Sequence, residues 1–389
     1  MTTTLNTKPT RPDGSVALGV RGHLRVGGAT LNWRVFAGIA ATIAVLAAVA
    51  LSGHGSGRDL ILPTGIALMV ALAYANGSND VSKAIATLAG SCVTNYRRAI
   101  AWGTICTVIG SLCSAVIAKT VIGAFTKGFI AKNVAQTEIF ALAVLLGATL
   151  WVLLATRISM PVSTTHAIIG SLLTVGAFVF GVRNVQWHTL LSKVVIPLVA
   201  SPFIALALAL VAYLIIKVTL ARFSGGVMNS LHWLSSGVAS FARGLNDTPK
   251  VVALGVAFYL ISSGNPKYQA PFWLFALVAL GMGLGSFISG LKVTKTLAEK
   301  VTKMDNTEGF SANIVTAFLV ASASNLGLPV STTHVSSGAI IGIGLRRGVQ
   351  SVRWMVVRDM ALAWVVTLPA AGLLGVLAYL ALRAVHGGM

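Results

Sequence analysis

The chain has 389 residues, of which 56% are hydrophobic and only 10% are charged. Its mean hydropathy is +0.84. A soluble domain of this size needs far more polar surface to face water, so the composition excludes a soluble protein. Apolar runs of roughly 20 residues, the length that crosses a bilayer, recur along the chain without the alternation of barrel strands. We therefore expect an all-α polytopic membrane protein.

The formal net charge of +20 does not indicate nucleic-acid binding, because most basic residues lie in short loops. Examples are Arg97-Arg98, Arg346-Arg347 and the segment 292–303. Lys and Arg gather in the cytoplasmic loops of membrane proteins. We expect a multi-pass protein of the plasma membrane, in contact with lipid and not with nucleic acid, with its N-terminus in the cytoplasm.

The predicted elements begin with a basic, disordered tail over residues 1–34, followed by an extra N-terminal helix over 35–58. The apolar run 35–52 is too long for the core of a cleavable signal peptide. We expect about 10–12 transmembrane segments in all, with candidate apolar runs near 35–52, 60–76, 97–118, 138–156, 162–181, 192–216, 246–263, 271–290, 311–326, 333–345 and 359–383.

Two motifs recur in the same order and at nearly the same separation. Residues 74–91 read YANGSNDVSKAIATLAGS and residues 241–257 read FARGLNDTPKVVALGVA, while PVSTTH occurs at 161–166 and again at 329–334. The chain is therefore two homologous repeats. The predicted division is repeat 1 over 59–190, a connecting helix and loop over 191–227, repeat 2 over 228–356 and a C-terminal helix over 357–389.

Duplicated halves in a membrane protein are typical of a transporter whose binding site lies where the repeats meet, near the middle of the bilayer. We expect the repeats to be inverted and to contain broken or re-entrant helices.

Nine acidic residues occur in the chain, and only Asp80 and Asp247 lie inside a repeated motif flanked by apolar sequence. A carboxylate within the membrane costs about 3 kcal/mol on insertion scales and is a functional candidate. The alternative is an ion pair within each helix, Asp80 with Lys83 and Asp247 with Lys250. Gly-x-Asn-Asp favours an unwound segment in which the Asn or the Asp of the motif caps the next half-helix. The remaining acids are assigned to the tail, to segment ends or, for Glu299, Asp305 and Glu308, to a basic polar loop.

Each PVSTTH string has the pattern of a helix start, because Pro is tolerated in the first turn. The hydroxyls that follow are Ser163, Thr164, Thr165, Ser331, Thr332 and Thr333. Free N–H groups and the positive end of the helix dipole favour an anion there, and hydroxyls add donors without full charge. The alternative is that these residues only mark close helix packing. His166 and His334 either orient the segment, relay protons or touch the anion.

Other chemistries fit less well. A symmetric pair of serines without G-x-S-x-G does not suit a hydrolase, so we expect no enzymatic activity. The three cysteines, Cys92, Cys106 and Cys113, lack metal-ligand spacing and are predicted to be buried apolar residues. We expect no cofactor and no firm metal site.

Together these motifs resemble the inorganic phosphate transporter (PiT) family, over about residues 60–350. The resemblance implies a duplicated, inverted architecture with phosphate bound at the pseudo-twofold centre. It implies phosphate ligands among the six hydroxyls named above, together with Asn79 and Asn246. It implies a coupling ion, Na⁺ or H⁺, at Asp80 and Asp247, where Na⁺ is the one metal ion to consider.

The chain departs from the family at the coupling site. Many members carry Asn where Lys83 stands, and sodium-coupled members tend to carry Glu near Thr107 and near Asn313, where this chain has no acid. An ammonium group can replace a bound cation or contact the anion, so we predict proton coupling through Asp80 or Asp247, with Lys83 and Lys250 as accessory residues.

Two alternative functions stay open at this point. Sulfate is also tetrahedral, so a sulfate permease of the same architecture fits the motifs. A carboxylate that accepts a proton from the anion favours phosphate if it touches the anion directly. A non-transporting membrane receptor or scaffold is the alternative of a different class. A homodimer is compatible with the sequence but not indicated by it.

Overall fold

The computed structural model describes residues 58–117, 122, 129–131, 134–220, 223–263, 270–328 and 330–387. The predicted tail 1–34 and all but the last residue of the predicted helix 35–58 lie outside this range. The helices are α2 (Arg58–Asp80), α3 (Ser82–Gly90), α4 (Tyr96–Ile117), α6 (Glu138–Arg157), α7 (Thr164–Phe180), α8 (Trp187–Leu190), α9 (Ile196–Thr219), α10 (Gly225–Ser263), α11 (Phe272–Ser289), α12 (Leu291–Glu299), α13 (Asn306–Asn325), α14 (Thr332–Arg346) and α15 (Trp354–Gly387). The only β pairing in the described part is one isolated bridge, Ile130 with Val185.

Five of the described helices are long and apolar enough to cross a membrane: α4, α6, α9, α11 and most of α15. Large apolar side chains such as Phe203 on α9 and Val365 on α15 are exposed, as lipid-facing residues must be. The chain is thus an all-helical, multi-pass membrane protein. Helices α2, α10, α13 and α14 instead carry buried polar groups, which a bilayer tolerates only inside the protein. The expected total of 10–12 segments stays a prediction.

The two repeats have the same type of helix ending before the PVSTTH helix. Before α7, Ser159 adopts φ 65° and the N–H of Met160 bonds to Ala155 O at 2.9 Å. Before α14, Gly327 adopts φ 68° and the N–H of Leu328 bonds to Ala323 O, also at 2.9 Å. A left-handed residue followed by this long-range bond is the Schellman ending of a helix. The duplication seen in the sequence therefore extends to individual hydrogen bonds.

Packing between the repeats is reciprocal. Helix α9, which lies beyond the predicted end of repeat 1, packs on α13 and α14. Helix α15, which lies almost entirely beyond the predicted end of repeat 2, packs on α6 and α7. In the same way α4 packs on α10 and α11 packs on α2. Glycines allow these close approaches: a Cβ at Gly77, Gly244, Gly110 or Gly285 would collide with the carbonyl oxygen of Met282, Thr107, Phe241 or Tyr74, respectively.

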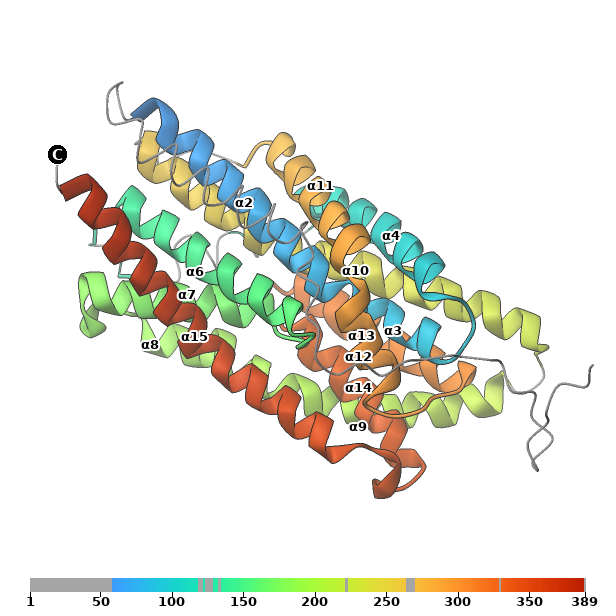
Figure 1. Ribbon diagram of the computed structural model, residues 1–389. Coiled ribbons are helices and arrows are strands. Elements are labelled where there is room, and N and C mark those ends of the chain that lie inside the picture. Colours follow the sequence, from blue (N-terminus) through green and yellow to red (C-terminus); the bar gives the residue numbers. More distant parts are fainter. Residues whose placement is uncertain are drawn as a thin grey trace, which may run out of the picture. The chain divides into compact units, whose positions relative to one another are not determined.

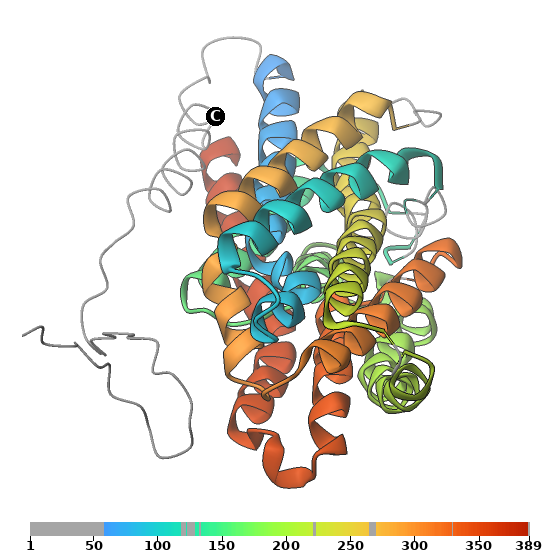
Figure 2. The ribbon, with the colours of Figure 1, turned by 90° about the vertical axis from the view of Figure 1, so that its right-hand side faces the viewer.

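The repeats run in opposite directions. In Figure 1 α2 runs towards the middle of the helical bundle from one end, and the first half of α10 runs towards it from the other end. Figure 2, at right angles, shows the same antiparallel course of α2 and α10. Equivalent helices that approach the centre from opposite ends are the arrangement expected of inverted repeats.

The prediction of unwound Asn-Asp segments is wrong. Only Val81 interrupts the helix in repeat 1, with φ −56° and ψ −32°, and no side chain caps α3. In repeat 2, α10 continues for 39 residues through Asn246 and Asp247. The motif glycines serve close helix packing instead. The predicted apolar run at 246–263 also begins too late, because the first half of α10 buries polar residues that an apolar window misses.

The assignment of Glu299 and Glu308 to a loop is wrong, because Glu299 is the last residue of α12 and Glu308 lies in the first turn of α13. Asp305 lies in the loop before α13, as predicted. Asp305 caps α13 in a capping box with Glu308, whose side chain is fully buried. Glu308 forms ion pairs of 2.6 Å with both Arg346 and Arg347 at the end of α14. These contacts tie the start of α13 to the end of α14 at one end of repeat 2.

Candidate functional site

The two Asn-Asp-x-x-Lys motifs come together in the protein interior. Asp80 and Lys83 are each 1% exposed, as is Lys250, and Asp247 is 3% exposed. Lys83 Nζ lies 2.8 Å from Asp80 Oδ1, and Lys250 Nζ lies 3.3 Å from Asp247 Oδ1. The ion pairs proposed as an alternative on the sequence are therefore present in both repeats. They do not exhaust the site, because each lysine also has ligands outside its own helix.

The ammonium group of Lys83 is surrounded by oxygen atoms. It donates to Asn79 O at 2.9 Å, to Asn79 Oδ1 at 2.6 Å and to Asp80 Oδ1 at 2.8 Å. Val162 O, in the first PVSTTH string, lies 3.5 Å away. A carboxylate, an amide oxygen and two backbone carbonyls are the ligands that a bare alkali cation would use in a transporter.

The second lysine has an equivalent setting. Lys250 Nζ donates to Val330 O at 2.9 Å and to Thr165 Oγ1 at 2.9 Å, in addition to Asp247. Val330 occupies in the second PVSTTH string the place of Val162 in the first. The bond to Thr165 joins the two repeats, because Thr165 belongs to α7 and Lys250 to α10.

Both motif asparagines position the segment before a PVSTTH helix. Asn79 Nδ2 donates to Thr156 Oγ1 and to Met160 O, both at 2.9 Å. Asn246 Nδ2 donates to Val330 O at 3.2 Å and to Asp247 Oδ1 at 3.0 Å. The asparagines therefore link the motifs to the start of α7 and α14, and their amide groups are already engaged.

The PVSTTH hydroxyls divide into caps and cluster members. Ser163 Oγ accepts the N–H of His166 at 3.2 Å, and Ser331 Oγ accepts that of His334 at 3.3 Å, so both serines are N-caps. In the first copy, Thr164 donates to Asp80 Oδ2 at 3.4 Å.

The second copy reaches across to the first. Thr333 donates to Val162 O at 2.8 Å. Thr332 is 3% exposed at the start of α14. Both helix starts therefore lie at the junction of the repeats.

The two histidines lie against each other, with ring centroids 4.7 Å apart. His334 Nδ1 lies 2.9 Å from Leu198 O, and its ring centroid lies 4.0 Å from that of Trp364, with the two planes tilted by 42°. Among the described residues, His166 Nδ1 and His334 Nε2 have no hydrogen-bond partner. The contacts of His334 suit an orienting role, and the roles in proton relay or anion contact stay predictions.

Two residues that the sequence reasoning did not select also belong to the cluster. Asn76 Nδ2 donates to Asp80 Oδ2 at 3.0 Å and to Asp247 Oδ2 at 3.2 Å, and so bridges the carboxylates of both repeats. Arg243 is 1% exposed and interacts electrostatically with the same two carboxylates. Aligning the two motifs points to both residues, because Asn76 and Arg243 each stand directly before Gly-x-Asn-Asp.

Thr107 and Asn313 mark the places near which sodium-coupled members of the family tend to carry Glu, and the two residues have different surroundings. Thr107 accepts a hydrogen bond of 3.0 Å from Arg243 Nη2, so it belongs to the surroundings of the cluster. Asn313 is buried on α13, and both side-chain polar atoms lack a partner in the described part of the chain. Of the three cysteines, Cys106 is buried as predicted, whereas Cys92 is exposed with φ 61°.

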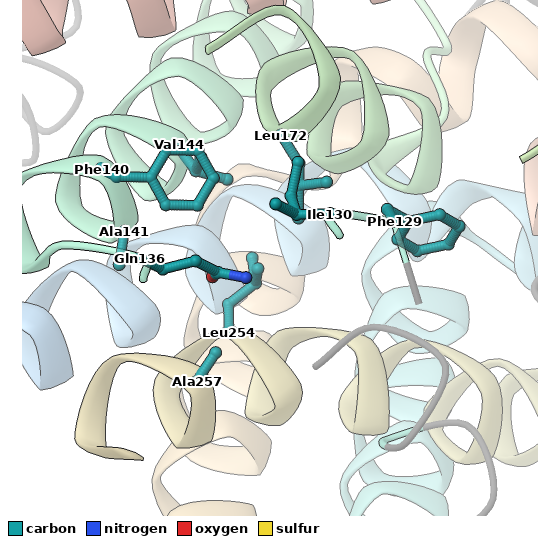
Figure 3. A pocket seen from close by; sticks show the side chains of 9 residues that line it. All are labelled: Phe129, Ile130, Gln136, Phe140, Ala141, Val144, Leu172, Leu254 and Ala257. Atoms are coloured by element: carbon teal, nitrogen blue, oxygen red, sulfur yellow. The ribbon is translucent and has the colours of Figure 1, made fainter. Parts of the chain in front are cut away.

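A small cavity of about 20 Å³ lies away from the charged cluster, between α6, α7 and the second half of α10. Figure 3 shows that its lining is apolar, from residues such as Phe140, Leu172 and Leu254, apart from the amide of Gln136. It contains no charged side chain, so it is not an anion site. The groups able to hold an anion lie instead in the buried cluster.

Comparisons with known proteins agree with this architecture. The model of the Phosphate transporter family matches residues 76–230 and again 221–375. A protein of Rhizobium meliloti (strain 1021) named "Probable low-affinity inorganic phosphate transporter" is 31% identical over 81% of this chain and 95% of its own length. A protein of Bacillus subtilis (strain 168) with the same name is 30% identical over 83% of this chain and 98% of its own.

A solved structure named "The sodium-dependent phosphate transporter" has the same fold, with a TM-score of 0.75 and 26% identity. The similarity covers 83% of this chain and 99% of that one.

Proposed function

We propose that the chain, which belongs to the phosphate transporter family, imports inorganic phosphate across the plasma membrane by symport with protons. The observation that carries this proposal is the buried cluster in which the Asn-Asp motifs of both repeats meet the start of α7 and α14. Transporters built from inverted repeats bind their substrate at such a junction. In this proposal the chain acts as a transporter and not as an enzyme, and the N-terminus lies in the cytoplasm.

The anion is proposed to bind between the two PVSTTH helix starts. Thr165 and Thr332 supply hydroxyl donors, and Thr164 and Thr333 add theirs when they leave Asp80 Oδ2 and Val162 O. The serines and the motif asparagines hold the helix starts in place. Free N–H groups and the positive ends of α7 and α14 then add favourable electrostatics. Such donors hold a tetrahedral oxyanion and release it again, which a transport cycle requires.

Proton coupling is favoured because the places suited to a coupling cation are already filled. Lys83 Nζ has three oxygen ligands within 2.9 Å, and Lys250 Nζ has two at 2.9 Å. A sodium ion entering either cage would have to displace a covalently attached ammonium group. The carboxylates of Asp80 and Asp247 remain as the proton carriers. The sodium dependence for which the structural neighbour is named is a property of that protein.

Uptake of labelled phosphate into proteoliposomes tests this proposal. An inward proton gradient in sodium-free choline buffer should drive uptake, and a protonophore should abolish it. Uptake that requires sodium would refute proton coupling, and loss of phosphate uptake in the presence of equal sulfate would refute the choice of substrate.

Two substitutions test the carriers. Asp80→Asn and Asp247→Asn should each abolish uptake while the protein stays in the membrane. Asp359→Asn is the matched control, because Asp359 is exposed and, among the described residues, forms an ion pair only with the exposed Arg358. Full uptake by both variants would exclude the proposed mechanism.

A further inference from the structure

Arg243 carries hydrogen-bond donors that no other described residue uses. Its Nη2 donates to Thr107 Oγ1 at 3.0 Å and to Ser286 Oγ at 3.4 Å. Its Nε and Nη1 are buried and have no partner within the described part of the chain. A guanidinium group presents five N–H donors, and buried donors are nearly always paired in folded proteins. The unpaired donors therefore need an acceptor that the described residues do not supply.

Asn76 has an unpaired hydrogen-bond acceptor, which complements the unpaired donors of Arg243. Its Nδ2 is fixed by the two carboxylates, so its Oδ1 must point elsewhere, and this oxygen is buried without a donor among the described residues. Asn76 and Arg243 occupy the same position of the two repeats. Asn76 on α2 thus keeps an unused acceptor and Arg243 on α10 keeps unused donors. Asn76 bonds to both Asp80 and Asp247, and Arg243 interacts electrostatically with the same two carboxylates.

The charges of the cluster do not cancel. Its buried charged side chains are the carboxylates Asp80 and Asp247 and the cations Lys83, Lys250 and Arg243. Each lysine is paired with the aspartate of its own motif. The guanidinium of Arg243 is the excess positive charge, and a buried charge without a counter-charge is strongly unfavourable. While both carboxylates are ionised, one net negative charge brought by a ligand would balance the cluster.

These three observations select one chemical class of ligand. The ligand must accept hydrogen bonds from a guanidinium, donate one to an amide oxygen and carry a single net negative charge. The dihydrogen phosphate ion does all three, whereas sulfate is fully deprotonated and can only accept hydrogen bonds. Arginine suits this task because its planar donors match oxyanions well.

We infer that Arg243 and Asn76 are substrate-contacting residues that select singly charged, protonated phosphate over sulfate. The inference rests on the proposed function and adds to it the ionic form of the substrate and the residues that recognise it. Arg243 supplies the charge and the donors, and Asn76 supplies the acceptor that sulfate cannot use.

Binding of labelled phosphate to the purified full-length protein tests this inference, with unlabelled phosphate and sulfate as competitors. Arg243→Gln removes the charge, and Arg243→Lys keeps it but loses the planar set of donors. Both should weaken phosphate binding about tenfold or more, as expected when a charged hydrogen bond is lost. Asn76→Ala should move the ratio of phosphate to sulfate affinity towards one, a change that a merely structural role would not produce.

Arg358→Gln is the control, because Arg358 is an exposed arginine outside the cluster. A single melting transition and a monodisperse elution peak establish folding for each variant, and Arg243→Lys decides the result if Arg243→Gln does not fold. Unchanged phosphate affinity in a folded Arg243 variant, or unchanged selectivity in Asn76→Ala, would overturn the inference. Absence of phosphate binding by the wild-type protein would instead refute the proposed function.

Discussion

Replacement of Lys83 by alanine should convert the protein into one that sodium stabilises. The substitution leaves Asn79 O, Asn79 Oδ1, Asp80 Oδ1 and Val162 O around an empty position, with the negative charge of Asp80 uncompensated. These are oxygen ligands of the kind that bind alkali cations in transporters. Sodium should therefore enter the cage that the ammonium group has left.

The size of the effect follows from the burial of the ion pair. The side chains of Lys83 and Asp80 are 1% and 2% exposed, and their charged atoms are 2.8 Å apart. Breaking a buried pair by removing one partner costs about 3–5 kcal/mol. A ligand at one hundred times its dissociation constant restores about 2.7 kcal/mol. Sodium at that concentration should thus restore more than half of the stability lost, if the loss is about 3 kcal/mol.

The assay is unfolding of the purified protein in sodium chloride and in choline chloride at equal ionic strength. The wild-type protein should unfold alike in both salts, whereas Lys83→Ala should be destabilised in choline and partly restored by sodium. Lys300→Ala is the control, because Lys300 is exposed at the end of α12. Equal stability of Lys83→Ala in the two salts would refute the idea that Lys83 replaces a coupling cation.

Two further predictions concern the scaffold of the site. Gly77→Ala should lower the yield of folded protein and its melting temperature, because the new Cβ would collide with the backbone of Met282, whereas Gly225→Ala, with open space around it, should not. Ser331→Ala should lower the free energy of unfolding by about 1 kcal/mol through loss of the α14 N-cap, as measured by denaturant titration. A fall in melting temperature for Gly225→Ala as large as that for Gly77→Ala would contradict the packing role of Gly77. An unchanged free energy of unfolding for Ser331→Ala would contradict its role as N-cap.

The sequence was sufficient to predict the duplication and the main components of the site. Two motifs in the same order determine how the repeats correspond, and carboxylates are so costly in a bilayer that Asp80 and Asp247 stand out without a structure. PVSTTH likewise predicts a helix start, and both serines are N-caps as that pattern requires. These features are local, so sequence spacing alone determines them.

The contacts across the repeats could not be predicted in the same way. Gly-x-Asn-Asp suggested an unwound chain because glycine and asparagine commonly break helices, yet Gly77 and Gly244 serve close helix packing. A glycine can break a helix or allow another helix to pack closely against it, and which of the two occurs depends on helices distant in the sequence. Arg243 was passed over for a similar reason, since a basic residue in a basic chain stands out only once its burial is known.

The difference between the repeats is as informative as their likeness. Perfect symmetry would place either two asparagines or two arginines beside the carboxylates. Two asparagines would leave the cluster neutral, with no electrostatic reason to admit an anion. Two arginines would leave two excess charges, suited to a fully deprotonated dianion, and no acceptor for a protonated one. One asparagine and one arginine give a single positive charge together with both a donor and an acceptor. The asymmetric pair therefore follows from the need of a nearly symmetric transporter to recognise a ligand that both donates and accepts hydrogen bonds.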